Sequence, residues 1–232
     1  HPGHYQKKDV LSIEGCPLAG DSLDSLFMRH RLNLYFGAKA KYRLPMSENV
    51  LTMPPGVTER LENPAHIVHL KEKLTYEFIR EVEKCTLGDE SKKAIQRLKV
   101  LIDDQQIFSF FEEIEKTKRQ LSAEDFSLFN FDYPDIEISE KFTAEQFVEW
   151  AQATRQQIFS AVDRCLASAN LTADQVDLVC LTGGTSKVPF IRQEFENRFG
   201  VEKLQAQSHF HSVLSGLVES ARFWSEGVDL TN

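Results

Sequence analysis

The sequence predicts the α/β fold class, with a mostly helical segment that carries one β-hairpin followed by a smaller segment of strand and helix. Apolar residues recur at helical spacing over most of residues 63–121 and again from residue 143, whereas residues 126–139 alternate as in a hairpin. The short apolar run 178–181 leads into two glycines and a further helical pattern. This last order is typical of a strand–turn–helix unit.

The composition is that of an ordinary soluble globular protein, with 41% hydrophobic and 27% charged residues. The length of 232 residues allows one large domain or two small ones. A net charge of -8 argues against general binding to nucleic acid or to anionic membranes. We see no apolar run of membrane-spanning length and no signal peptide, and the four cysteines form no CxxC pair. We therefore expect a cytoplasmic protein, and the absence of an initial methionine suggests a segment of something longer.

The first half of the chain is expected to contain four elements. Residues 10–17 read as a strand and its exit, and a helical pattern follows through Leu26 and Leu34. Residues 42–62 contain three prolines and a glycine and predict an irregular connection. Asn63 and Pro64 are a cap and first-turn pair for a helix that Gly88 should end.

The second half continues with a long helical pattern from about residue 91 to 121, with a break near residues 103–104. Pro134 and Asp135 stand at the expected turn of the hairpin. Thr143 and Gln146 form a capping box that opens the next helix, on which Trp150 is expected to belong to the core. A last helix is expected over residues 212–224.

Two adjacent glycines, Gly183 and Gly184, separate a predicted buried strand from a predicted helix. Thr185 or Ser186 can cap this helix, which opens near Pro189. Such a loop allows a ligand to approach the backbone closely, with N–H groups of the helix facing it. The alternative is a tight turn that binds no ligand. Cys180 is expected to be a small buried apolar residue of the preceding strand.

A polar row on the helix before the hairpin is the second candidate site. Glu115, Lys118, Arg119 and Ser122 follow one another at i, i+3, i+4 and i+7, and therefore share one helix face. An arginine can stack on a purine, a lysine and a glutamate can bind ribose hydroxyls, and a serine can bind the edge of a base. The alternative is a solvated face on which Glu115 and Arg119 simply pair.

Together these pieces resemble the ATPase domain of the seventy-kilodalton heat-shock chaperones, the DnaK family. The family has a G-G-S/T-x-R-x-P loop that contacts the adenosine, and residues 183–189 stand in its place. It has an E-x-x-K-R-x-x-S helix on the opposite side of the adenine, which Glu115, Lys118, Arg119 and Ser122 match position for position. Its L-G-G-x-x-F-D motif resembles residues 18–24, including Gly20. The three elements occur in the family's order, and the similarity runs from about residue 10 to 224.

The resemblance implies the second lobe of an actin-like, ribonuclease H-like ATPase fold. The expected parts are the end of the inner strands (1–17), an outer helical subdomain with the hairpin (18–142), an inner α/β subdomain (143–208), a final helix that would pack on the first lobe (209–225) and a tail (226–232). It also implies binding of ATP or ADP. The expected contacts are Gly20, Glu115, Lys118, Arg119, Ser122, Gly183, Gly184, Thr185 and Lys187.

Further expectations concern the whole protein. The resemblance implies a stress-response chaperone that works with client proteins, a co-chaperone or a nucleotide-exchange factor. The D-x-G-T and D-x-G-G-G-T phosphate loops of the family and its catalytic lysine do not occur in this sequence. We therefore expect no hydrolysis by this chain alone, and Mg²⁺ binding only together with the first lobe. The divergent bacterial YegD-like homologs resemble the chain most, because the segment between Asp24 and Glu115 is long.

Three departures from the family pattern bear on this expectation. Lys187 replaces an arginine and so loses a planar group, Phe210 stands where an aspartate is usual, and Ala19 replaces a glycine. They leave open an alternative function, that of a degenerate, non-hydrolysing scaffold for protein contacts. A sugar kinase or filament protein of the actin superfamily is a further alternative. Histidine pairs at 66 and 69 and at 209 and 211 lack further ligands, so no metal site is expected.

Overall fold

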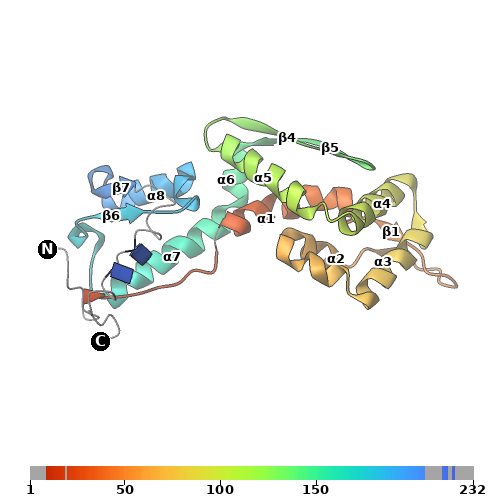
Figure 1. Ribbon diagram of the computed structural model, residues 1–232, viewed down its shortest axis with the longest axis horizontal. Coiled ribbons are helices and arrows are strands. Elements are labelled where there is room, and N and C mark those ends of the chain that lie inside the picture. Colours follow the sequence, from red (N-terminus) through yellow and green to blue (C-terminus); the bar gives the residue numbers. More distant parts are fainter. Residues whose placement is uncertain (1–8, 19, 207–215, 219–220, 223–232) are drawn as a thin grey trace. The chain divides into compact units, whose positions relative to one another are not determined.

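The computed structural model describes residues 9–18, 20–206, 216–218 and 221–222 (Figure 1). The chain divides into two compact units. The helical unit is Asp21–Gln152, and the α/β unit combines His1–Gly20 with Ala153–Asn232. The subdomain boundaries expected from the sequence stay predictions.

Four helical segments build the core of the helical unit: α1 (Gly20–His30), the 3-10 helix η2 (Leu32–Phe36), α4 (Asp89–Asp103) and α5 (Ile107–Leu121). They are amphipathic and pack their apolar faces together. Large aromatic side chains fill the space between them. Phe110 is fully buried, with its ring 5.2 Å from that of Phe36 and 5.1 Å from that of Phe129. The expected break between α4 and α5 is confirmed, at residues 104–106.

The helix expected to start at Asn63 is divided in the structure. Asn63 does cap a helical segment, and its side chain accepts a hydrogen bond from the N–H of Ala65. That segment is the 3-10 helix η4 (Pro64–Leu70), and α3 (Lys73–Cys85) starts after a break. Gly88 does not end α3, because the short strand β3 (Thr86–Leu87) separates the two. Gly88 instead adopts φ +78° and directly precedes α4. Apolar periodicity alone does not distinguish one helix from two in line.

The segment expected to be irregular contains short elements. β1 (Lys41–Tyr42) lies between β2 (Leu51–Thr52) and β3 in a small antiparallel sheet. The helices α2 (Pro55–Thr58) and η3 (Glu59–Glu62) follow. Elements of two to four residues are too short to produce a periodic sequence pattern, and the prediction therefore missed them.

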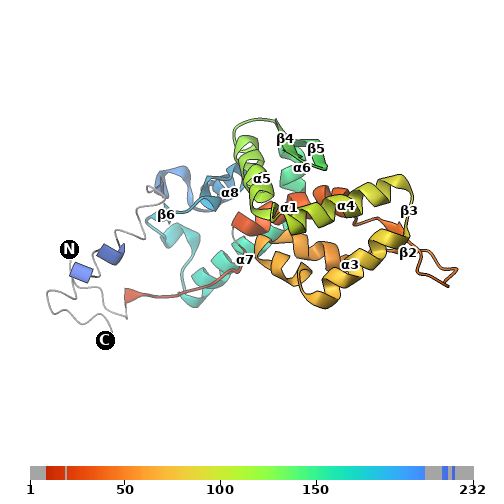
Figure 2. The same ribbon diagram turned by 45° about the vertical axis from the view of Figure 1, so that its right-hand side comes forward.

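The predicted hairpin is confirmed. β4 (Phe126–Tyr133) pairs with β5 (Ile136–Thr143) over eight residues, and Asp135 adopts φ +65° in the turn. The hairpin lies along α5 in Figures 1 and 2. The capping box of Thr143 and Gln146 is also confirmed and opens α6 (Ala144–Trp150). The ring of Trp150 packs edge-on against two buried phenylalanines and stacks on His30 at 4.8 Å.

The α/β unit contains a parallel pair of strands, β6 (Val179–Leu181) and β7 (Leu204–Ala206). Its main helices are α7 (Gln152–Ser168) and α8 (Pro189–Phe199). The short 3-10 helices η5 (Ala173–Gln175), η6 (Thr185–Lys187) and η7 (Val201–Lys203) connect these elements. The predicted order of strand, glycine turn and helix is therefore confirmed around β6 and α8.

Two expectations for this unit are wrong. Residues 10–17 form no strand, and Val10, Leu11 and Ile13 are exposed. An apolar segment becomes a strand only beside a hydrogen-bonding neighbour, and this one has none within the described residues. Cys180, the middle residue of β6, is exposed and not buried as expected.

The last predicted helix falls largely outside the described residues, as do Ala19, His209, Phe210 and His211. Residues 216–218 and 221–222 are helical. Of the helices in the described ranges, none combines the length and apolar character that crossing a membrane requires.

Candidate functional site

The glycine loop follows β6 and belongs to the α/β unit. Gly183 adopts φ +83°, a backbone region that favours glycine, and turns the chain away from the strand. The 3-10 turn Thr185–Lys187 comes next, and its N–H at Lys187 donates to the carbonyl of Gly184 at 3.1 Å. The Ser186 hydroxyl donates to the carbonyl of Gly183 at 2.7 Å. The loop is therefore held by its own hydrogen bonds.

The expected cap of α8 is wrong. The residue before the helix is Val188, and neither Thr185 nor Ser186 reaches the end of the helix, because the 3-10 turn lies between. Pro189 occupies the first helical position as predicted. The N–H groups of Ile191 and Arg192 both donate to the carbonyl of Val188 at 3.0 Å. These two donors are therefore already satisfied and do not face a ligand.

Gly184 differs from Gly183 in what its backbone requires. Its φ of -65° is a conformation that every L-residue adopts. A Cβ atom placed on either glycine would meet no heavy atom within 4 Å. The fold itself therefore needs glycine at 183, whereas the missing side chain at 184 only leaves the backbone open to an approaching group.

The second candidate site is the last turn of α5, in the helical unit. The apolar face of the helix is buried as predicted, with Phe110, Ile114, Thr117 and Leu121 at 0–5% exposure. Beside it, Glu115 and Arg119 are the exposed pair, and 4.0 Å separates a carboxylate oxygen of Glu115 from Nε of Arg119. The Ser122 hydroxyl, just past the helix end, donates to the carbonyl of Lys118 at 3.1 Å.

Lys118 is turned away from this exposed pair and toward α1. Its Nζ lies 2.7 Å from Oδ1 of Asp24 and donates a hydrogen bond to Oδ2 at 2.9 Å. The two side chains are only 13% and 10% exposed. The polar row predicted from helical spacing therefore divides into an exposed pair, Glu115 and Arg119, and a lysine bound to a carboxylate of another helix.

Burial raises the pKa of Asp24 above its ordinary value. The ammonium of Lys118 opposes this and lowers that pKa, whereas the negative charges of Glu115 and Asp21 add to the increase. In the sequence, Asp24 stands out only as the end of a motif. The signal that could have shown its role is an aspartate among Leu23, Leu26 and Phe27 on the apolar face of α1, since a buried carboxylate requires a partner.

The remaining predicted site residues take less distinctive positions. Gly20 is the first residue of α1. Thr185 is half-buried, and Lys187 is exposed on the 3-10 turn. The structure thus gathers Gly183, Gly184, Thr185 and Lys187 in one loop and Glu115, Arg119 and Ser122 at one helix end, each set within its own unit.

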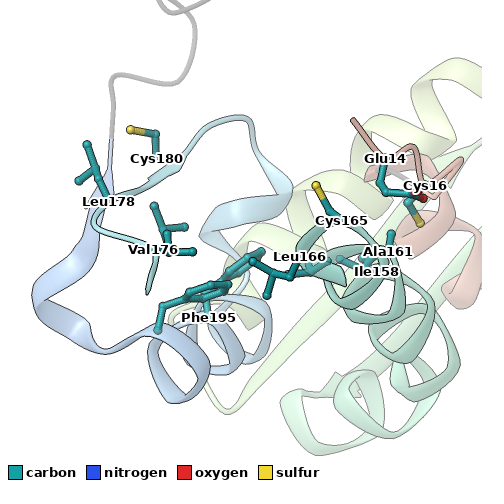
Figure 3. Close-up of a pocket in the computed structure, with 13 residues that line it drawn as sticks. Glu14, Cys16, Ile158, Ala161, Cys165, Leu166, Val176, Leu178, Cys180 and Phe195 are labelled. Atoms are coloured by element: carbon teal, nitrogen blue, oxygen red, sulfur yellow. The ribbon is translucent and has the colours of Figure 1, made fainter. Parts of the chain in front are cut away.

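The α/β unit also contains an apolar groove of about 500 Å³, which the sequence did not predict (Figure 3). It lies among α7, β6 and α8, and Phe195 contributes a large aromatic wall. Three cysteines, Cys16, Cys165 and Cys180, line it. Among its described lining residues the charged one is Glu14, which pairs with Arg164 at 3.2 Å. The other described lining side chains are aliphatic, aromatic or thiol groups.

The described histidines do not form a metal site. His66 and His69 are exposed, as expected, and His69 bonds to Glu72 at 2.7 Å. Within the described ranges no group of three or more histidine, cysteine or acidic side chains has the arrangement of a metal site.

Comparison with known proteins finds similarity to one family over part of the chain. The family model described as "Hsp70 protein" matches residues 86–211, a range that includes the end of α5 and the glycine loop. A heat shock protein homolog of the yeast Saccharomyces cerevisiae is 31% identical over 88 residues, which are 37% of this chain and 13% of that protein. Heat shock protein hsp88 of Neurospora crassa is 28% identical over 88 residues, 37% of this chain and 12% of the relative.

A bacterial relative gives a shorter match. Chaperone protein dnaK1 of Synechococcus elongatus is 38% identical over 56 residues, which are 24% of this chain and 8% of that protein. The matched part therefore spans about an eighth or less of each of these relatives.

Proposed function

The chain belongs to the Hsp70 family, and on that premise we propose that it forms the second lobe of an actin-like nucleotide-binding domain. In this proposal it provides one wall of an adenosine site for ATP or ADP. The observation that carries the proposal is that the family match, residues 86–211, includes both the exposed Glu115–Arg119 pair and the open glycine loop. Among subgroups, we propose the YegD-like homologs as the nearest.

Each group has a proposed contact with the nucleoside. Arg119 is 70% exposed, so its planar guanidinium is free to stack on the adenine face. The Glu115 carboxylate accepts hydrogen bonds from ribose hydroxyls, and the Ser122 hydroxyl meets the edge of the base. Gly184 carries no side chain that would block approach of the sugar to the backbone.

The chemistry on the phosphates is proposed to belong to other residues of the whole protein. Phosphoryl transfer depends on groups that hold the terminal phosphates and Mg²⁺, and the phosphate-loop motifs of the family do not occur in this sequence. We propose that lobe movement in the whole protein couples nucleotide binding to a client, a co-chaperone or a nucleotide-exchange factor.

The test is nucleotide binding by the full-length protein with Arg119→Ala. Loss of a stacked guanidinium should weaken ADP and ATP binding about tenfold, the equivalent of about 1.4 kcal/mol. Isothermal titration calorimetry measures the change. Lys116→Ala is the matched control, because Lys116 lies on the same helix and pairs with Glu113. Equal affinity in wild type and Arg119→Ala would eliminate Arg119 from the site.

A non-hydrolysing scaffold is the second candidate function, and Lys187 is the observation that favours it. Lys187 is exposed in the glycine loop and lacks the planar group that an arginine would offer to a base. An intact full-length protein without magnesium-dependent nucleotide binding would support the scaffold over the chaperone.

A further inference from the structure

A pocket of about 370 Å³ opens on the helical unit between α2 and α3 (Figure 1). Apolar side chains form its walls, with Pro54 and Val57 on one side and Leu74 and Phe78 on the other. Its volume lies at the lower end of the range of small-ligand pockets, about 300–1,000 Å³. The Hsp70 family match starts at residue 86, so the pocket lies outside it.

Part of this apolar surface is open to solvent. Leu74 is 81% exposed although it lines the pocket, and Gly56 on the α2 side is exposed as well. A Cβ atom placed on Gly56 would meet no heavy atom within 4 Å. Burial of apolar area is favourable, so a ligand that covered this leucine would gain free energy of binding.

Arg60 is the charged residue among the described lining residues, and its guanidinium is held in place. Nη1 donates hydrogen bonds to the carbonyl of His69 and to the hydroxyl of Thr75, both at 3.0 Å. These bonds join η3 to η4 and to α3. A guanidinium that the fold already holds loses less conformational entropy when it binds a ligand.

One edge of this guanidinium is available. Within the described residues, Nε and Nη2 of Arg60 donate no hydrogen bond, and no carboxylate lies at ion-pair distance. The nearby carboxylates have other partners, because Glu62 accepts from Arg29 and Glu72 accepts from His69. The bond from His69 lowers the pKa of Glu72, and the charge of Arg60 adds to this effect without contact.

Arg29 shows what this edge of a guanidinium binds. Its Nε and Nη2 both donate to Oε2 of Glu62, at 2.9 and 2.7 Å. Two N–H groups side by side match a carboxylate in geometry as well as in charge. Arg60 has the same edge beside apolar walls, which exclude water and strengthen an interaction between opposite charges. The groups together fit a ligand with a carboxylate at one end and an apolar group at the other.

We propose that this pocket binds a small apolar carboxylate, with Arg60 on the carboxylate and the side chains of Pro54, Leu74 and Phe78 around the apolar group. A free fatty acid and the C-terminal residue of a peptide both have this chemistry, and the first experiment distinguishes them. The pocket shares no residue with the glycine loop or with the exposed end of α5. The inference therefore does not depend on the proposed nucleotide binding.

The first experiment follows ¹³C-labelled leucine and valine methyl groups of the full-length protein by NMR. Octanoate and N-acetyl-leucyl-phenylalanine represent the two sources, and octanamide and the amide of the same dipeptide are the uncharged controls. The signals of Val57 and Leu74 should shift, and at least one acid should bind about tenfold or more tightly than its amide. Binding of either acid or of both supports the site and identifies the source. Equal binding of acid and amide, or no binding of either acid, would overturn the proposal.

Arg60→Gln tests the charge. It should weaken binding of the acid about tenfold and leave binding of the amide within about twofold of wild type. Arg80→Gln is the matched control, because Arg80 is an exposed arginine of α3 outside the pocket lining. Equal affinity for the acid in wild type and Arg60→Gln would overturn the proposal.

Leu74→Ala decides the question even where Arg60→Gln fails to fold, because a residue that is 81% exposed contributes little to packing. It should weaken binding of acid and amide alike, by about threefold or more, since it removes apolar contact area. Phe108→Ala is the control, because Phe108 is 62% exposed on α5 and does not line the pocket. Unchanged affinities in Leu74→Ala would overturn the proposal.

Discussion

At the scale of single residues, the two glycines of the loop after β6 differ in backbone conformation. Gly183 lies at φ +83°, where an added Cβ strains the backbone, although the space around it is open. Gly184 lies at φ -65° in equally open space. The sequence alone presents them as an equivalent pair, and the backbone angles separate a structural requirement from an accessible surface.

We predict that Gly183→Ala lowers the free energy of unfolding by about 1 kcal/mol or more, because alanine is strained at positive φ. Gly184→Ala is the matched control and should leave stability unchanged or slightly raised. Urea denaturation of the two variants measures the difference. If the proposed adenosine contact is right, Gly184→Ala should weaken ADP binding instead. Equal destabilisation by both substitutions would contradict the assignment.

At the scale of elements, two tyrosines tie other elements to the turn between α4 and α5. Tyr76 on α3 donates a hydrogen bond to Asp103 at 2.5 Å, and Tyr133 on β4 donates one to Asp104 at 3.1 Å. Gln105 in the same turn adopts φ +57°. The break that the sequence predicted near this aspartate pair is thus held by side chains from distant segments.

The tie to Tyr76 predicts a loss of stability in alkali. The hydrogen bond to Asp103, together with burial, raises the pKa of Tyr76 to about 12, above the ordinary value near 10. The folded state then holds its proton more tightly than the unfolded state, so this stabilisation is complete below pH 10 and is lost as the pH rises toward 12.

Tyr76→Phe should remove that part of the pH dependence and lower stability near neutral pH by about 1 kcal/mol, the usual contribution of one hydrogen bond. Denaturation curves between pH 7 and pH 12, with a phenolate absorbance titration, check the pH window set by the raised pKa. Asp103→Asn keeps the tyrosine and should move its pKa back toward the ordinary value. A Tyr76 pKa that stays raised in Asp103→Asn, or a stability–pH curve that is unchanged in Tyr76→Phe, would contradict the assigned role of the bond.

At the scale of the whole molecule, the chain contains two units, each with its own buried residues. Aromatic packing around Phe110 belongs to the helical unit, whereas Phe159 and Phe195, with ring centroids 4.9 Å apart, belong to the α/β unit. Units with separate cores are expected to open separately.

We predict that Phe110→Ala destabilises the helical unit by about 3–5 kcal/mol, because it removes a fully buried ring and leaves a cavity. Hydrogen exchange in α4 and α5 should accelerate strongly, whereas exchange in α7 and α8 should stay near the wild-type rate. Mass spectrometry of peptic fragments measures both regions in one experiment. An equal loss of protection in the two units would show that they unfold as one.

Much of the local structure could be predicted because its causes lie within a few residues. The side chains of Thr143 and Gln146 each bind the other residue's backbone N–H, and Pro189 fits the first turn of a helix. In β4, buried and exposed side chains alternate because only one face of the strand is buried. The strand predicted over residues 10–17 was wrong because a strand also requires a hydrogen-bonding neighbour, which local sequence does not reveal. Residues 10–17 have strand composition but no neighbouring strand in the described part, so they stay irregular.

The family and the two candidate sites follow from the amino-acid sequence, because the order of the glycine loop and the α5 row is a property of the chain alone. What each site residue is free to do depends on the three-dimensional packing. Spacing on a helix places Lys118 beside Arg119, but it gives no information about a carboxylate 94 positions away. Burial makes that carboxylate bind the nearest cation, and Lys118, one of the two expected ribose contacts, therefore pairs with Asp24.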